Sequence, residues 1–135
     1  MIEEPNGIQA NVLIADDDPA ILRLVKTIVE KEGFTVLSAR DGKEAYKLLQ
    51  TNQPFAAAIF DVVMPYIQGT ELVRYMQSEK RLMRIPVIMM TAEQNPRLSS
   101  ESFSVGAVAF LPKPFTTSQL QTMLRMCVQR GQSNK

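Results

Sequence analysis

The sequence contains no histidine and a single cysteine, Cys127. Without histidine the chain cannot form a Ser–His–Asp triad, a zinc site that uses imidazole, or a phosphohistidine of its own. One cysteine cannot close an internal disulfide, which favours a reducing compartment. Cys127 also lies in an apolar helical pattern, where we expect a small buried side chain rather than a reactive thiol.

A large net charge and a long hydrophobic run are absent as well. The formal net charge of +1 gives no bulk attraction to nucleic acid or to an anionic membrane. No stretch approaches the roughly 20 apolar residues of a membrane-spanning helix. Met1–Gln9 lacks the basic start and the apolar core of a signal peptide. We therefore expect a cytoplasmic protein that binds neither nucleic acid nor membranes directly.

Hydrophobic residues make up 45% of the 135 positions, which is enough for the core of one domain. We expect an N-terminal tail at 1–10, the domain at 11–130 and a polar C-terminal tail at 131–135. Short apolar runs bounded by Asp, Pro or Gly are typical of strands. They lie at 11–15, 34–39, 55–60, 85–90 and 107–111.

Helical patterns fill the intervals between these runs and follow the last one. Helix-capping residues and apolar stripes predict where each helix begins. The predicted starts are Asp18 before Pro19, Asp41 with Glu44 three residues on, Gln68, Asn95 before Pro96, and Thr116 or Thr117. The fourth helix has a weak apolar stripe. Five alternations of strand and helix predict an α/β fold, with a parallel sheet covered by helices on both faces.

Polar side chains follow four of the predicted strands. In a parallel sheet the carboxyl ends of the strands meet at one edge, where sites form. The residues at that edge are Asp16, Asp17 and Asp18 after the first strand, Asp61 after the third, Thr91 after the fourth and Lys113 near the end of the fifth. Crowded carboxylates raise one another's pKa or require a cation, and carboxylate oxygens are ligands that Mg²⁺ prefers.

These residue types together fit phosphoryl transfer. A carboxylate can accept a phosphoryl group as an acyl phosphate. The ammonium of Lys113 and the hydroxyl of Thr91 would neutralise the transferring oxygens and hold them in line. Asp18 has the more ordinary role of a helix cap. Each position alone is a weak signal, and the conjunction of all of them at the ends of four strands carries the prediction.

The same residues resemble the response-regulator receiver domains of two-component signalling, of the chemotaxis-regulator kind. The likeness spans roughly residues 11 to 130. The matching stretches are Val12–Pro19, Asp41–Ala45, Asp61–Pro65 with Gly69, Thr91-Ala92 and Lys113-Pro114-Phe115. The resemblance implies a doubly wound, flavodoxin-like receiver fold, with five parallel strands in the order 2-1-3-4-5 and five flanking helices. It also implies a cis bond between Lys113 and Pro114.

The resemblance assigns roles to the site residues. Asp61 would be the phosphoacceptor, paired with Lys113 and Thr91. Mg²⁺ or Mn²⁺ would be bound by Asp17, Asp61 and the backbone carbonyl of Val63, with Asp16 acting largely through metal-bound water. No other cofactor is implied. The domain would catalyse only its own phosphorylation and dephosphorylation, and would not be an enzyme that acts on other substrates.

The resemblance also implies partners and an output. A sensor histidine kinase or a phosphotransfer protein would donate the phosphoryl group, and an effector protein or output domain would receive the signal. Thr91 and Phe110 would be the switch residues. The output surface would be formed by the fourth helix, the fifth strand and the fifth helix, with Phe103, Met123 and Met126 on it. A dimer that forms on phosphorylation is compatible with this scheme.

Two residues depart from the family pattern. Phe110 has no hydroxyl, so only ring packing is left for a switch at that position. Val63, two residues after Asp61, cannot orient an attacking water by hydrogen bonding, and Glu93 is the one nearby side chain that could assist or repel water. We therefore expect a long-lived phosphoryl group.

The sequence raises three alternatives, of which the FMN carrier is set aside because its phosphate would be repelled. Asp16 and Asp18 have the spacing of the two aspartates in haloacid-dehalogenase-type phosphatases, although Pro19 departs from that motif. A flavodoxin-like FMN carrier requires a phosphate loop after the first strand, where this chain is triply acidic. The last alternative is a docking module that works without phosphorylation.

Overall fold

The computed structural model describes residues 10–133, with side chains for residues 10–128. Five strands alternate with five helices along the chain. They are β1 (Asn11–Ala15), α1 (Pro19–Lys31), β2 (Thr35–Ala39), α2 (Gly42–Leu49), β3 (Phe55–Asp61), α3 (Gly69–Gln77), β4 (Val87–Thr91), α4 (Pro96–Val105), β5 (Ala109–Pro112) and α5 (Thr117–Ser133). All strand pairs are parallel, and the order β2-β1-β3-β4-β5 confirms the predicted topology.

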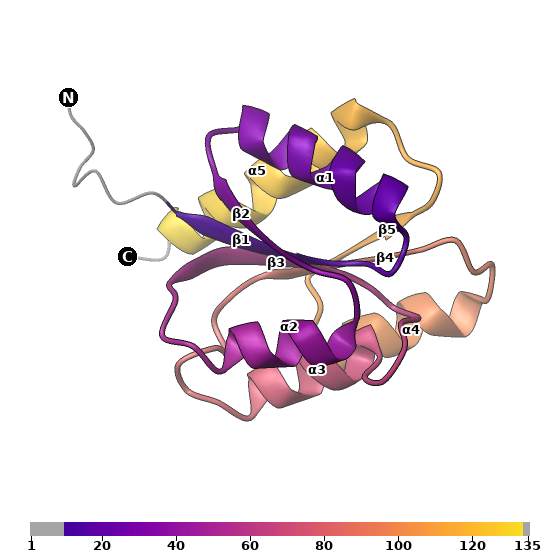
Figure 1. The fold of residues 1–135 in the computed structure, drawn as a ribbon, viewed down its shortest axis with the longest axis horizontal. Coiled ribbons are helices and arrows are strands. Elements are labelled where there is room, and N and C mark those ends of the chain that lie inside the picture. Colours follow the sequence, from indigo (N-terminus) through magenta and orange to yellow (C-terminus); the bar gives the residue numbers. More distant parts are fainter. Residues whose placement is uncertain (1–9, 134–135) are drawn as a thin grey trace.

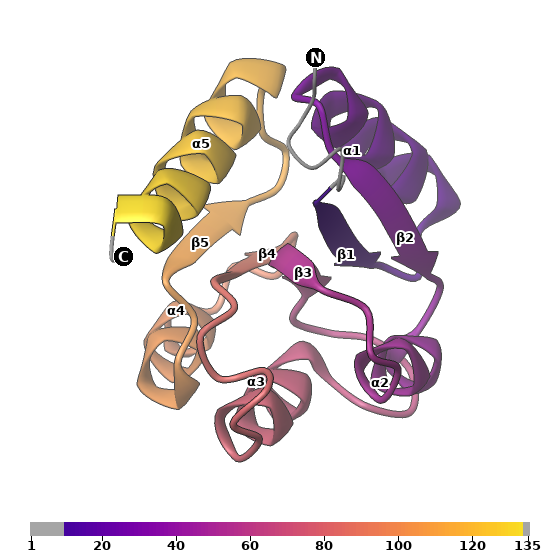
Figure 2. The same ribbon diagram turned by 90° about the vertical axis from the view of Figure 1, so that its left-hand side faces the viewer.

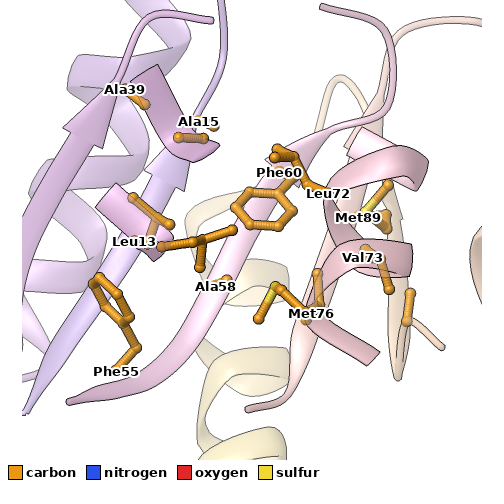
Figure 3. Packing of buried hydrophobic residues seen from close by; sticks show 14 of the residues in the cluster. Leu13, Ala15, Ala39, Phe55, Ala58, Phe60, Leu72, Val73, Met76 and Met89 are labelled. Atoms are coloured by element: carbon orange, nitrogen blue, oxygen red, sulfur yellow. The ribbon is translucent and has the colours of Figure 1, made fainter. Parts of the chain in front are cut away.

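The sheet lies between two layers of helices. Figure 2 shows α1 and α5 on one face and α2, α3 and α4 on the other. Each central strand is buried on both faces, because its alternate side chains enter different clusters. In β3, Ala58 and Phe60 pack toward α2 and α3, whereas Ala57 and Ile59 pack toward α1 and α5. Figure 3 shows the first cluster, where Phe60 lies near Leu72 of α3.

Side chains cap the first turns of four helices, α1, α2, α4 and α5, at the predicted places, and at α5 the Thr116 hydroxyl accepts the Gln119 N–H at 3.1 Å. The Asp18 carboxylate accepts a hydrogen bond from the Ala20 N–H at 2.9 Å. Asp41 accepts from the Glu44 N–H at 2.8 Å, and Asn95 accepts from the Arg97 N–H at 3.0 Å. These bonds satisfy amides that the first turn of a helix leaves without an intrahelical partner.

Helix α4 is held weakly, as its sequence predicts. Ser102 is its only fully buried residue, and the ring of Phe103 is 50% exposed. The Ser102 hydroxyl donates to the Leu98 carbonyl at 2.7 Å, so this buried oxygen is satisfied within the helix itself. Little apolar surface therefore fixes α4 to the sheet.

The last helix differs from the prediction at its end. Helix α5 continues to Ser133, so residues 131–133 of the expected C-terminal tail are helical. A glycine inside a helix costs only about 1 kcal/mol relative to alanine, and Gly131 therefore does not stop it. The expected tail at 1–9 and residues 134–135 lie outside the described residues. Within the described part of the chain, none of the helices is long and apolar enough to cross a membrane.

Candidate functional site

Three carboxylates meet at the carboxyl edge of the sheet. One oxygen from each of Asp16, Asp17 and Asp61 lies within 4.8 Å of the others, a spacing that could hold a metal ion. Asp16 is 1% exposed and Asp61 is 6% exposed, whereas Asp17 is open to solvent. The predicted acidic cluster therefore forms, and the turns after β1, β3 and β4 all lie at this edge, on the right in Figure 1.

Asp61 is placed by β3, the central strand of the sheet. β3 is flanked by β1 and β4, and Asp61 lies opposite Met90 in the β3–β4 register. The chain then turns sharply, and the Gly69 N–H donates back to the Val62 carbonyl at 2.9 Å. A Cβ at Gly69 would clash with the Asp61 carbonyl, so the close return of the chain requires glycine here.

Lys113 reaches two of the carboxylates from the edge of the sheet. Its Nζ donates to Asp16 Oδ2 at 2.7 Å and to Asp61 Oδ2 at 3.3 Å. Only 10% of the lysine side chain is exposed, so this ion pair is largely shielded from water. The Lys113–Pro114 bond is cis, as predicted, and Pro112 lies on edge strand β5, where a missing donor is tolerated.

Asp16 is the better satisfied of the two buried acids. Its Oδ1 accepts the Asp18 N–H at 2.9 Å, and its Oδ2 accepts the close bond from Lys113. Asp61 accepts the longer lysine bond and a 3.4 Å bond from the Val63 N–H. Asp61 therefore has the less compensated charge, which leaves it more able to bind an incoming group.

The Thr91 side chain is buried at the end of β4. This strand lies between β3, which carries Asp61, and β5, which leads to Lys113. The exposed fraction of Thr91 is 2%, and its Oγ1 accepts the Glu93 N–H at 3.1 Å. That bond uses an oxygen lone pair and leaves the hydroxyl hydrogen to donate to another acceptor. The backbone ties this residue to the lysine, because the Lys113 N–H donates to the Thr91 carbonyl at 2.9 Å.

The charges in the cluster change the proton affinity of two groups. Burial raises the pKa of Asp61 to about 6, the negative charge of Asp16 adds to the rise, and Lys113 only partly offsets it. Burial alone would lower the pKa of Lys113, but the bonds and charges of Asp16 and Asp61 outweigh it and raise that pKa above its usual value. Lys113 therefore remains a cation, and Asp61 is the group that titrates.

The raised pKa of Asp61 makes metal-free stability depend on pH. Between the ordinary carboxyl pKa of 3.8 and about 6, the folded protein holds a proton that the unfolded chain has released. Stability should therefore fall as pH rises through this interval, by up to roughly 3 kcal/mol. Urea unfolding in a metal chelator from pH 4 to pH 7 measures this. Asp61→Asn should remove the slope, and equal slopes in both proteins would contradict the assignment.

The two switch candidates border one pocket. Thr91 and Phe110, with Lys113 and residues 92–96, line a cavity of about 320 Å³ beside the β4–α4 turn. The Phe110 ring is half-buried and lies 6.5 Å, centroid to centroid, from the exposed ring of Phe103. The fold therefore brings Thr91 and Phe110, the two predicted switch residues, to the same cavity.

Asp18 is the acid that the fold keeps away from the cluster. Its carboxylate caps α1 and is exposed. Sequence reasoning did not single out Tyr66, whose backbone is unusual in the turn after β3. The signal in the sequence was the turn at residues 65–68. It contains no glycine to adopt the positive φ that Tyr66 has there.

Comparison with known proteins identifies the class of this fold and site. The family model for the response regulator receiver domain matches residues 12–125. The chain therefore belongs to the response regulator receiver domain family, and it is a phosphorylation-controlled signalling domain. The cluster of Asp16, Asp17 and Asp61 fits the phosphoacceptor site of such a domain.

Individual relatives agree with the family. The chain is 32% identical over 118 residues to the response regulator GtcR of Aneurinibacillus migulanus, covering 84% of this chain and 47% of that protein. It spans about half the length of the curated relatives that it matches. A CheY-like receiver domain protein from Methanospirillum hungatei has a solved structure with a TM-score of 0.86 and 29% identity. The match covers 95% of this chain and all of that one.

A more distant structure includes a metal. The receiver domain of a sensor histidine kinase from Pseudomonas aeruginosa has a TM-score of 0.80 and 21% identity, over 90% of this chain and 99% of that one. That protein was crystallised with a magnesium ion coordinated in its active-site cleft. At this identity the likeness concerns the fold.

Proposed function

We propose that Asp61 accepts a phosphoryl group from a phosphohistidine on a sensor histidine kinase or phosphotransfer protein. The observation that carries the proposal is the meeting of three carboxylates within 4.8 Å at the sheet edge, two of them bonded to Lys113. Because these 135 residues contain no histidine, the donor histidine must lie outside them. We place the exchange in the cytoplasm, a reducing compartment that suits a chain with one cysteine.

The chemistry of the acids fits a divalent cation. One or two carboxylates together with several waters are the usual ligands of Mg²⁺ in proteins, and Mn²⁺ accepts the same hard oxygens. Asp17, Asp61 and the backbone carbonyl of Val63 would bind the ion, with Asp16 acting through its water. The P. aeruginosa receiver domain, whose cleft holds magnesium, supports this choice. When bound, the cation would neutralise charge on the acids and on the phosphoryl oxygens.

The residues of the chain have separable tasks in the transfer. Asp61 forms the new phosphorus–oxygen bond as the phosphorus–nitrogen bond of the donor breaks, and the imidazole keeps that electron pair. The Lys113 ammonium and the Thr91 hydroxyl are donors aimed at the charge on the transferring oxygens. Asp16 holds the lysine, at 2.7 Å, in the position from which it reaches Asp61.

A small phosphodonor tests the proposal directly. Wild-type protein incubated with acetyl phosphate and Mg²⁺ should gain the mass of one phosphoryl group on Asp61, and a chelator should abolish the gain. Intact-protein mass spectrometry measures the gain, and peptide mapping locates it. Labelling at another residue, or labelling that is indifferent to the chelator, would contradict the site.

Phosphorylation of Asp61 would change the conformation of the residues around it. A phosphoryl oxygen that recruits the Thr91 hydroxyl would pull the threonine inward and vacate space that the Phe110 ring can fill, beside the 320 Å³ cavity. The weakly held helix α4 would then shift, because little apolar surface fixes it. The altered surface of α4, β5 and α5 would bind an effector protein or an output domain, or pair with a second phosphorylated copy. Nucleic acid and membranes are not partners in this scheme.

The lifetime of the phosphoryl group should depend on the side chain at position 63. This side chain is 42% exposed beside Asp61 and offers no hydrogen bond to an attacking water. We expect Val63→Asn to shorten the lifetime by about tenfold, the scale of one well-placed polar contact. Loss of the label after removal of acetyl phosphate measures the rate, with Val108→Asn as the control, because this similarly exposed valine lies just before β5, at the opposite end of that strand from the site. An unchanged lifetime would count against the idea.

The alternatives receive little support from the geometry. The phosphatase hypothesis requires Asp16 and Asp18 to face one substrate. However, Asp18 caps α1, and both side-chain oxygens of Asp16 already accept hydrogen bonds. Turnover of a phosphate ester that is lost in Asp16→Ala and kept in Asp61→Asn would revive it. A docking module without phosphorylation would give no labelling at all in the acetyl phosphate experiment.

A further inference from the structure

Tyr66 has a backbone conformation that the rest of the described chain reserves for glycine. Its φ angle is 72°, and it is the one non-glycine residue with positive φ among the described residues. Side chains with a Cβ are disfavoured in this region, whereas glycine adopts it without cost. An unfavourable residue that persists at such a position suggests that its side chain does something useful.

The folded domain itself gains little from the ring. Tyr66 is 77% exposed and belongs to neither hydrophobic cluster. Its one described contact of note is with the Lys43 ammonium, which lies 5.8 Å from the ring centroid at the start of α2. A cation–aromatic contact at an exposed site is weak. Packing within the domain does not explain the residue.

The turn that carries Tyr66 is fixed in place on both sides. The Pro65 carbonyl accepts the Ile67 N–H at 2.9 Å and the Gly42 N–H at 3.3 Å. A Cβ at Gly42 would clash with the Ile67 carbonyl, so the turn lies directly against the start of α2. After the turn, the backbone at Gly69 lies against the carbonyl group of Asp61. The ring is therefore presented in a defined position on the turn that begins at the phosphoacceptor.

The burial of Asp61 determines what a protein donor must contact. Because Asp61 is only 6% exposed, a phosphohistidine can reach it only if the surface around that histidine covers the rim of the site. On the β3–α3 turn the rim offers two exposed apolar side chains, Val63 and Tyr66. A small donor such as acetyl phosphate reaches the carboxylate without covering this turn.

We propose that Tyr66, with Lys43 beside it, is a docking contact for the phosphohistidine-bearing protein. The inference rests on the proposed function and names how the donor is recognised. The donor would present an apolar patch to the ring and an acidic side chain to the Lys43 ammonium. Large exposed aromatic residues often contribute strongly to protein association. The strained backbone then serves to display the ring.

The test compares a protein donor with a small one. The protein donor is a histidine kinase core, autophosphorylated with radiolabelled ATP and chosen from a panel as the one that labels the wild type fastest. In Tyr66→Gly we expect the second-order rate of transfer from this donor to fall about tenfold or more. Labelling by acetyl phosphate should stay within about twofold, since that donor does not need the contact. Tyr66→Phe should transfer like the wild type.

Stability measurements separate docking from a structural role. Glycine fits the φ of 72°, so Tyr66→Gly should unfold at the same or a higher urea concentration than the wild type. Tyr66→Asn, which also tolerates this conformation, is the second variant if the glycine variant is less stable. Lys43→Glu should reduce transfer from the protein donor and leave acetyl phosphate labelling intact.

Several outcomes would overturn the inference. Unchanged protein-to-protein transfer in both Tyr66→Gly and Tyr66→Asn would do so, and so would an equal loss with acetyl phosphate, which would make the residue structural. A panel in which no kinase core labels the wild type would also count against it. Failure of acetyl phosphate to label wild-type Asp61 would instead contradict the proposed function itself.

Discussion

Asp61→Asn should take up no phosphoryl group from acetyl phosphate or from a phosphorylated kinase. An amide oxygen is a poor nucleophile, and it loses the charge that attracts a cation, whereas its shape matches the carboxylate closely. The expected loss is complete within the sensitivity of intact-protein mass spectrometry. Because the variant also removes a carboxylate whose pKa burial raises to about 6, it should be at least as stable as the wild type at pH 7.

The matched control for this variant is Asp18→Asn. It makes the same chemical change in the same acidic region, but its carboxylate caps α1 and lies outside the cluster. Labelling should persist, and stability should change by no more than about 0.5 kcal/mol, because asparagine caps a helix about as well as aspartate. Residual labelling of Asp61→Asn equal to that of Asp18→Asn would show that another residue accepts the phosphoryl group.

Lys113→Met should weaken both the chemistry and the fold. The substitution leaves Asp16 and Asp61 facing one another without the ammonium that bonds them at 2.7 and 3.3 Å. Breaking a buried pair by removing one partner costs about 3 kcal/mol or more, so the metal-free variant should unfold at a clearly lower urea concentration. Phosphorylation should fall about 100-fold or more, because a donor aimed at the transferring oxygens is gone.

Two further proteins make this result interpretable. Adding Asp16→Asn to Lys113→Met removes the uncompensated charge, so it should recover most of the stability and little of the labelling. Lys26→Met, an exposed lysine on α1, should change stability by no more than about 0.5 kcal/mol. A Lys113→Met protein as stable as Lys26→Met would mean that the ion pair contributes nothing to the fold.

The sequence was sufficient to locate the acidic cluster and to propose Asp61 as its phosphoacceptor. Strand periodicity places Asp61 at the end of a buried strand, and the geometry of parallel sheets then brings it to Asp16 and Lys113. The caps at Asp18 and Asp41 were equally predictable, because capping depends on neighbours within three residues. The response regulator family match confirms the resemblance that these motifs carried.

Other features depend on contacts that local patterns do not encode. Lys113 lies closer to Asp16 than to Asp61, and this depends on contacts between residues about 50 to 100 positions apart in the chain. At the predicted start of α2, the Glu44 carboxylate accepts from the Arg40 N–H at 2.7 Å, a bond that the spacing of Asp41 and Glu44 did not predict. The left-handed backbone of Tyr66 arises where the turn is pressed against Gly42, a contact between segments far apart in sequence.

The raised pKa of Asp61 has a consequence for how the site exchanges charge with its surroundings. Three ionised carboxylates and one ammonium leave two negative charges, which one divalent cation balances. With Asp61 protonated, only one negative charge remains, so an arriving cation must expel that proton. The proposed binding of a divalent cation below pH 6 would therefore exchange the cation for this proton. A cell that acidifies would lower the metal occupancy of this domain, and with it the readiness of the domain to receive a signal.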